Sequence, residues 1–249
     1  MESQNTIEKL FKAGAHYALA SSRRHPSTKE YLFGAKGNVE LFDLEKTSAL
    51  LATALNFVSS LAQSRKTILF VGGQAPAREA VKRTAQSLGA PYVAGRWIGG
   101  TLTNWSEIKK RLSRLDELAE GMRSGELAKY TKRERSLMDH EISNLEVMFG
   151  GLRGLSRLPD ALVVIDPRFE SGSVEEANQL GIPVIALLNS DCNRSGITYP
   201  IPGNDASRET INFVLGEIGK TYNDNLGAAP TPAEAPLGHS PTGEAASQQ

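Results

Sequence analysis

The sequence is poor in the residues that build disulfides and cysteine-rich metal sites. It contains one cysteine, Cys192, among 249 residues. A single cysteine excludes an internal disulfide and any metal site made from a cysteine cluster. The four histidines do not stand at a metal-ligand spacing from Cys192 or from an acidic partner. No Gly-x-Ser-x-Gly turn is present for a nucleophilic serine. We therefore predict no bound metal, no other cofactor and no covalent catalysis.

Long apolar runs are also missing. No stretch approaches the roughly 20 apolar residues that cross a bilayer, and residues 1–12 are polar and then amphipathic, without the hydrophobic core of a signal peptide. Hydrophobic residues still make up 40% of the chain, which is enough for a sizeable core. These features predict a cytoplasmic globular protein that does not insert into a membrane.

The chain has no net charge, but its charge is unevenly distributed. Residues 1–159 hold 24 of the 28 Lys and Arg and 16 of the 28 Asp and Glu, a net charge of +8. Residues 160–249 hold the remaining 4 Lys and Arg and the remaining 12 Asp and Glu, a net charge of −8. This asymmetry favours a basic surface for a polyanion, although chance clustering of surface charge remains an alternative.

The first third of the chain shows helix, hairpin and helix patterns. Apolar residues at helical spacing predict a short helix over 6–20 and a longer one over 44–63. Between them, the apolar runs 31–33 and 39–42 flank a glycine-containing turn, the pattern of a β-hairpin.

Strands then alternate with helices. The apolar run 67–71 is typical of a strand buried on both faces of a parallel sheet. The alternation predicts a doubly wound parallel sheet, the arrangement of Rossmann-like α/β folds. We expect strands over 67–71, 92–93, 161–165 and 183–188, and helices over 77–88, 174–180 and 207–222.

A helical segment interrupts this alternation. Apolar residues from Ile108 to Met122, and again from Met138 to Leu152, are spaced by three and four, close to a heptad seam. Thr131 and Glu134 have the spacing of a capping box that would start the second helix. We predict an antiparallel coiled-coil hairpin over 104–155, inserted in an α/β domain formed by 1–103 and 156–225. The Pro-, Ala- and Gly-rich residues 226–249 are predicted to be a disordered tail.

An enzyme that binds a nucleotide or sugar phosphate is one functional hypothesis. Gly72-Gly73 and Gly99-Gly100 could form phosphate-binding loops, but neither the Gly-x-Gly-x-x-Gly pattern nor the P-loop lysine is present. Asp166, Asn189 and Asp191 follow predicted strands and could hold Mg²⁺. Such residues more often cap turns and helices, and we favour that interpretation.

Recognition of folded RNA is the second hypothesis, and a protein–protein adaptor that uses the coiled coil is a third. Basic residues gather in the N-terminal loops and at the root of the predicted hairpin, where phosphates would release counterions on binding. Trp97 and Trp105 could stack on bases or pack the hairpin against the body; core packing is favoured for Trp97. Arg153 and Arg157 are expected on the second helix, at the same root. The predicted RNA-binding residues are Arg23, Arg24, Lys29, Lys36, Arg96, Trp97, Thr103, Asn104, Lys109, Lys110, Arg111, Arg114, Arg153 and Arg157.

The run Arg96-Trp97-Ile98-Gly99-Gly100-Thr101-Leu102-Thr103-Asn104 resembles the signature of the bacterial small ribosomal subunit protein two family. It stands directly before the helical segment. Five further groups of residues match in the same order, so that the resemblance covers about residues 7–222. They include 33–35 with 43–47, 68–72, 158–162, 176–177 with 180–184, and 199–205.

This resemblance implies a flavodoxin-like domain with a protruding coiled-coil hairpin, in a non-enzymatic protein of the small ribosomal subunit that supports translation. The implied partners are small-subunit ribosomal RNA and neighbouring ribosomal proteins, including the large ribosomal protein one, and not DNA. The chain departs from the family pattern at 16–19, 25–27, 73–76 and 191–194. We therefore expect a reduced RNA footprint centred on Arg23, Arg24, Arg96 and the hairpin root.

Overall fold

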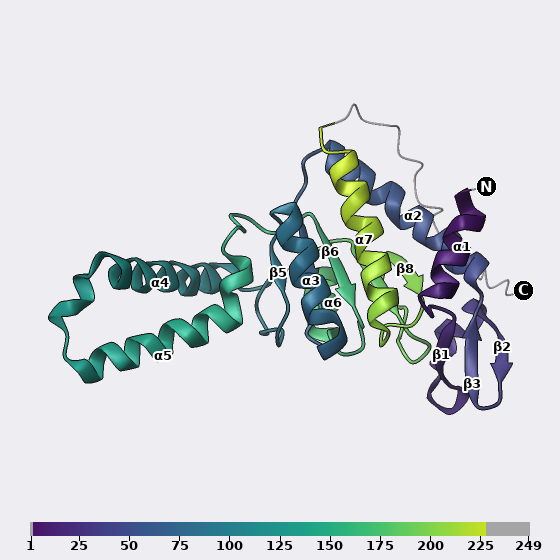
Figure 1. Ribbon diagram of the computed structural model, residues 1–249, viewed down its shortest axis with the longest axis horizontal. Helices are drawn as coiled ribbons and strands as arrows, with labels where there is room; N and C mark the ends of the chain where they lie inside the picture. Colours follow the sequence, from purple (N-terminus) through teal and green to yellow (C-terminus); the bar gives the residue numbers. More distant parts are fainter. Residues whose placement is uncertain (1, 228–249) are drawn as a thin grey trace, which may run out of the picture.

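The computed structural model describes residues 2–227 and has a parallel β-sheet at its centre (Figure 1). The sheet has five strands in the order β5-β4-β6-β7-β8, all parallel. Counted along the chain within this sheet, the order is 2-1-3-4-5, which is that of flavodoxin-like folds. The prediction of a parallel α/β sheet is confirmed. The strands are β4 (Ile68–Val71), β5 (Tyr92–Val93), β6 (Ala161–Ile165), β7 (Val184–Leu188) and β8 (Tyr199–Pro202).

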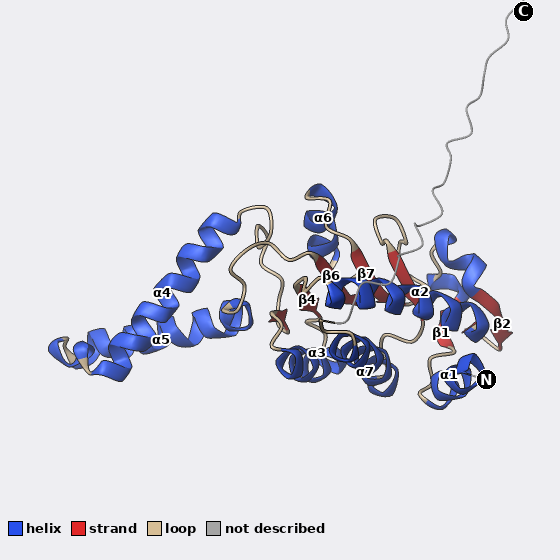
Figure 2. Cartoon of the chain, turned by 90° about the horizontal axis from the view of Figure 1, so that it is seen from above, coloured by secondary structure: helices blue, strands red, loops and turns tan. Residues whose placement is uncertain are grey.

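Helices cover both faces of the sheet because its strands are apolar on both sides. In β4, Leu69 and Val71 belong to one buried cluster, and Ile68 and Phe70 belong to the other. The second cluster is covered by α2 (Leu44–Gln63), α3 (Ala75–Leu88) and α7 (Arg208–Asp224). The first cluster packs against α6 (Ser171–Gln179) and the root of the helical hairpin. Figure 2 shows α3 and α7 on the side of the sheet opposite to α6.

The helical hairpin projects from the body at one end of the long axis (Figure 1). It consists of α4 (Trp105–Ser124), a 3-10 turn (Glu126–Lys129) and α5 (Lys132–Phe149). Gly125 ends α4 with a φ of 80°, and Thr131 forms the predicted capping box with Glu134. The two helices lie side by side along their predicted apolar seam. Coiled-coil packing along that seam stays a prediction.

A small antiparallel sheet forms the opposite end of the molecule (Figure 1). It has the order β1-β3-β2, made from β1 (Tyr17–Ala20), β2 (Leu32–Lys36) and β3 (Val39–Phe42), with α1 (Glu2–Lys12) beside it. The predicted hairpin is therefore present, but the prediction of a helix over 6–20 is wrong in its second half. Gly14, at a φ of 76°, follows the helix, and β1 then pairs with β3.

The strand β8 was not predicted. Its residues, Tyr199-Pro200-Ile201-Pro202, contain two prolines, which have no amide hydrogen and usually stand outside central strands. β8 lies at the edge of the sheet and pairs only with β7, so it tolerates both prolines. Among residues 2–227, no helix has the length and apolar content of a membrane span. The predicted disordered tail lies outside the described residues from position 228 onward.

Candidate RNA interface

A buried carboxylate organises the loop between β5 and α4. Glu176, on α6, accepts hydrogen bonds through Oε1 from the Trp97 indole N–H (3.0 Å) and the Gly100 amide (2.8 Å). Its Oε2 accepts from the Leu102 amide (2.9 Å) and from the amide and hydroxyl of Thr103 (3.0 and 3.1 Å). Burial alone would raise the pKa of Glu176, but these hydrogen bonds outweigh burial and hold the pKa below its ordinary value. Trp97, which is half-buried, and Thr103, which is exposed, therefore fix the loop through their hydrogen bonds to Glu176.

A second buried carboxylate closes the glycine turn after β4. The amide of Gly73 donates to Glu170 Oε1 at 2.6 Å, and burial raises the pKa of Glu170. A β-carbon at Gly73 would lie 2.2 Å from the Gly95 carbonyl oxygen, so only glycine fits there. Phosphate-binding loops use such free backbone amides. Here Glu170 occupies the Gly73 amide and Glu176 occupies the Gly100 amide, which disfavours a nucleotide-binding enzyme built on the two glycine loops.

The acidic residues at the carboxyl edge of the sheet organise turns. Asp166 follows β6 at a φ of 59°, and its Oδ1 accepts hydrogen bonds from the amides of Arg168 (3.2 Å) and Phe169 (3.1 Å). Its Oδ2 accepts from the side-chain amide of Gln74. Asp191 forms an ion pair with Arg168. These contacts agree with turn capping, the role that we favoured for this group over Mg²⁺ binding.

Asp205 lies in the same region and is strongly perturbed. Its Oδ1 accepts a hydrogen bond from the Asn189 side-chain amide at 2.8 Å. Burial raises the pKa of Asp205 to about 7, and the nearby Asp166 carboxylate adds to the rise. Ligand atoms of Asp166, Cys192 and Asp205 lie within 4.8 Å of one another. Burial also raises the pKa of the Cys192 thiol, which favours the neutral form over the thiolate that metals bind. We infer no metal site from this cluster.

Thirteen of the fourteen predicted RNA-binding residues fall into two groups, at opposite ends of the α/β body, and Arg157 belongs to neither group. The N-terminal group surrounds the three-stranded sheet, and the root group lies where the hairpin leaves the body (Figure 1). The structure therefore does not bring all of them onto one surface. The N-terminal group is Arg23, Arg24, Lys29 and Lys36; the root group is Arg96, Trp97, Thr103, Asn104, Lys109, Lys110, Arg111, Arg114 and Arg153.

Ion pairs divide the basic residues into two classes. One class has its charge matched by a carboxylate of the same chain, at 2.6–3.2 Å. The other class is exposed and forms no ion pair with any residue in the described part of the chain. The paired residues are Arg24 with Glu40, Lys110 with Glu107, Arg114 with Glu141, Arg153 with Asp116 and Glu146, and Arg157 with Asp160. The unpaired residues are Arg23, Lys29, Lys36, Arg96, Lys109 and Arg111.

Arg153 and Arg157 do not stand on the second helix of the hairpin, as predicted, because α5 ends at Phe149. Arg153 follows a 3-10 turn and bridges the two helices through Asp116 on α4 and Glu146 on α5. Arg157 pairs with Asp160, directly before β6, at the amino edge of the sheet. It is therefore separated by the length of the strands from Arg96, which follows β5 at the carboxyl edge.

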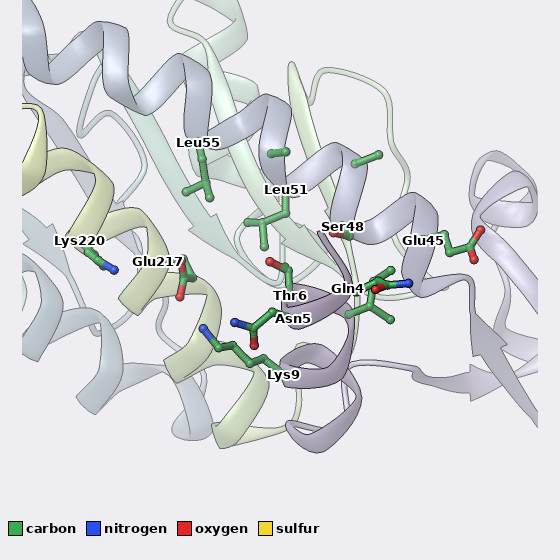
Figure 3. Close-up of a pocket in the computed structure, with 13 residues that line it drawn as sticks. Gln4, Asn5, Thr6, Lys9, Glu45, Ser48, Leu51, Leu55, Glu217 and Lys220 are labelled. Atoms are coloured by element: carbon green, nitrogen blue, oxygen red, sulfur yellow. The ribbon is translucent and has the colours of Figure 1, made fainter. Parts of the chain in front are cut away.

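Several hollows in the surface lie near these elements, among them one of about 480 Å³ on α4 that is lined by Lys109, Lys110 and Arg114. A groove of about 820 Å³ runs between α1, α2 and α7 (Figure 3). It contains side chains of both signs, including Lys9, Glu45, Glu217 and Lys220, and none of the predicted residues. A cavity of about 420 Å³ at the carboxyl edge of the sheet contains Arg96 and Trp97 from the predicted set.

The sequence did not reveal the roles of Glu170 and Glu176, although Glu176 stood in one of the segments that resembled the family. An acidic residue on a short helix is ordinarily exposed, and only the packing of α6 against the β5–α4 loop buries Glu176. Arg78 and Phe169, which line the carboxyl-edge cavity, were missed as well. Arg78 stands on α3 and Phe169 in the turn after β6, and only the sheet brings these two segments together.

Comparison with known proteins gives one family. The family model described as Ribosomal protein S2 matches residues 10–225. The small ribosomal subunit protein uS2 of Geotalea uraniireducens (strain Rf4) is 40% identical over 216 residues, covering 87% of this chain and 84% of that protein. The protein of the same name from Dictyoglomus thermophilum (strain ATCC 35947 / DSM 3960 / H-6-12) is 38% identical over 212 residues, covering 85% and 86%. The resemblance seen around Arg96–Asn104 is thus confirmed, and the chain belongs to the ribosomal protein S2 family.

Proposed function

We propose that this chain is a structural, non-enzymatic constituent of the small ribosomal subunit, and that it binds ribosomal RNA through phosphate and shape contacts. Membership of the ribosomal protein S2 family carries the proposal. The protein's part in translation is then to hold RNA and protein neighbours in place, and its site of action is the cytoplasmic ribosome.

The unpaired basic side chains support phosphate contacts at two places. Arg96, Lys109 and Arg111 lie at the hairpin root, and Arg23 and Lys36 lie near the three-stranded sheet. A cation without a protein carboxylate nearby can neutralise a phosphate without first breaking an ion pair, and each such contact releases counterions from RNA. We therefore assign the main RNA contacts to the unpaired class and smaller contributions to Arg114, Arg153 and the other paired residues.

Exposed apolar side chains support contacts with neighbouring ribosomal proteins. Val147, on α5, is 80% exposed, and Phe33, on β2, is 81% exposed. Large apolar side chains at such exposure are suited to protein interfaces. We propose that neighbouring small-subunit proteins pack on these surfaces, and that the large ribosomal protein one is among them.

Sedimentation tests the proposal directly. Tagged chain in a bacterial lysate is run on sucrose gradients at increasing salt, with RNase-treated lysate run in parallel. We expect co-migration with the small subunit that is lost in high salt and after RNase, because phosphate contacts weaken with salt. Sedimentation as a free protein at every salt concentration would contradict the proposal. Co-migration that survives RNase would instead identify a protein–protein adaptor.

A further inference from the structure

The carboxyl-edge cavity lies where ligands bind in open α/β sheets. It is formed by the loops that follow β4, β5 and β6, and it contains Gly73, Arg96 and Glu170 from these three loops. β4 and β6 are neighbours in the sheet, and the connections from their ends run to opposite faces, into α3 and α6. Crevices at such switch points are the usual ligand positions of this fold. The volume, about 420 Å³, falls in the range of ligand sites, about 300–1,000 Å³.

Two arginines bring positive charge to the cavity. Arg78, on α3, donates through Nε to the Gly73 carbonyl oxygen at 2.6 Å, which fixes the guanidinium beside the loop. Neither Arg78 nor Arg96 forms an ion pair within residues 2–227. A guanidinium presents a planar fork of donors that matches phosphate oxygens. Because Glu170 occupies the Gly73 amide, that amide is not available to a phosphate, and the two guanidinium groups are the donors that we assign to it.

Two aromatic rings line the same cavity. Phe169 is 57% exposed, and its backbone is fixed by the hydrogen bond of its amide to Asp166. Trp97 is held in position by the hydrogen bond from its indole N–H to Glu176. An exposed ring on a fixed backbone is a stacking surface for a base that has left its helix.

We propose that the carboxyl-edge cavity binds one unstacked nucleotide of an RNA strand, with its base stacked on Phe169 and its phosphate held by Arg78 and Arg96. The inference rests on the proposed function, because it names one contact within the RNA interface. A free phosphate as the ligand would account for the two arginines in the cavity but not for the exposed ring of Phe169. A cationic peptide is disfavoured by the two arginines.

Binding of small-subunit ribosomal RNA by the full chain, measured by filter binding across a salt series, tests this site. Phe169→Ala should weaken binding by about 5- to 100-fold, the usual effect of losing one stacked base, with an unchanged slope of log affinity against log salt. Arg78→Gln should lower that slope by about one unit. Ultraviolet cross-linking of the same complex should place an RNA adduct on the peptide that contains Phe169.

Matched controls come from the same chain. Phe11, 59% exposed on α1 and outside the cavity, controls for Phe169. Arg83, also on α3, bonds to Asn212 and lies outside the cavity, so it controls for Arg78. Phe11→Ala and Arg83→Gln should leave affinity and slope unchanged.

The possible failures can be told apart. If the wild-type chain does not bind the RNA, the proposed function fails. If the wild type binds and both cavity variants match their controls, only the cavity assignment is overturned.

A second experiment tests a free nucleotide as the occupant of the cavity. Guanosine or adenosine monophosphate is titrated into the chain alone, with tryptophan fluorescence as the readout. Micromolar binding that Phe169→Ala abolishes, with unchanged RNA affinity, would overturn the RNA assignment in favour of a free nucleotide.

Discussion

At the scale of single residues, the buried carboxylates determine the shape of the candidate interface. Glu176 joins α6 to the loop that leads into the hairpin, and Glu170 joins the start of α6 to the turn after β4. A buried carboxylate is costly unless donors surround it, and removing the charge leaves those donors unsatisfied. The family-like run from Arg96 to Asn104 is therefore built largely around an internal anion, and Arg96 is the charged side chain that it leaves exposed.

Replacing Glu176 by Gln should destabilise the protein. The amide group of Gln would face backbone N–H groups that now donate to a carboxylate, so we expect a loss of about 2–3 kcal/mol in the free energy of unfolding. Thermal melting should show a fall in Tm of several degrees. Glu175→Gln, at the exposed neighbouring position, should change Tm by much less. Equal melting of the two variants would contradict the role assigned to Glu176.

Neutralising Asp205 should have the opposite effect and stabilise the protein. Its pKa of about 7 in the folded protein is higher than that of an unfolded aspartate, so the folded state binds the proton more tightly. The charged form thus lowers stability above pH 7, and this penalty is relieved as the pH falls toward the unfolded pKa, about 4. Asp205→Asn should be more stable than wild type in urea unfolding at pH 8.5, with a smaller difference at pH 5 and the least below pH 4. Asp224→Asn, a change of the same kind at an exposed position, is the matched control. A variant that is less stable at pH 8.5 would contradict the assignment.

At the scale of elements, the hairpin packs on the body through its root and carries basic side chains along α4. Its root belongs to a core cluster of the body through Ile108, Leu112 and Phe149, whereas Met122 near its tip is 51% exposed. Along α4, neighbouring basic residues differ in environment. Arg114 contacts Glu141 across the hairpin at 3.2 Å, and Arg111 forms no ion pair within the described residues.

Because Arg111 is unpaired within the described residues and Arg114 is paired, the two arginines of α4 can be compared for their contributions to RNA binding. Arg111→Ala should lower the slope of log affinity against log salt by about one unit, because a phosphate contact is lost. Arg114→Ala should lower it by less, since Glu141 already offsets the charge of Arg114. Filter binding with small-subunit ribosomal RNA measures both slopes. Equal reductions would show that the ion pair with Glu141 does not restrict Arg114, as for a weak exposed pair.

At the scale of the whole molecule, the N-terminal group lies at one end of the elongated chain, and the root group lies where the hairpin joins the body (Figure 1). The α/β body stands between them and keeps them apart. A protein of this shape can hold two separate segments of RNA, because the groups cannot share one phosphate or one carboxylate.

Two double variants test for separate contacts. Arg23→Ala with Lys36→Ala removes charge at the N-terminal end, and Arg96→Ala with Arg111→Ala removes it at the root. Each pair should lower the salt slope by about two units, and their combination by about four, because distant sites act additively. If either pair leaves the slope unchanged, that end does not contact RNA phosphates. A combined effect well below the sum would show that the two ends are coupled.

Much of the fold could be predicted from local patterns. The buried runs at 68–71 and 161–165 are strands, α2 begins and ends at its predicted residues, and the capping box starts α5. β1 and β8 escaped prediction because their local signals point elsewhere. Tyr17–Ala20 continues an amphipathic pattern, and β8 contains two prolines. Both are strands because a neighbouring strand offers hydrogen bonds, which is a tertiary effect.

The sequence by itself determined the fold class, the position of the hairpin and the family, because hydrophobic periodicity, turn residues and ordered sequence motifs are local properties. It also located the basic residues. Only the tertiary structure decided which of them are free to meet RNA, since ion pairs such as Arg153 with Asp116 join residues distant in sequence. It also decided that Glu176 closes the signature loop and that Arg78, Arg96 and Phe169 share a cavity. Burial and charge pairing depend on distances in space, and these are set by how the helices pack on the sheet.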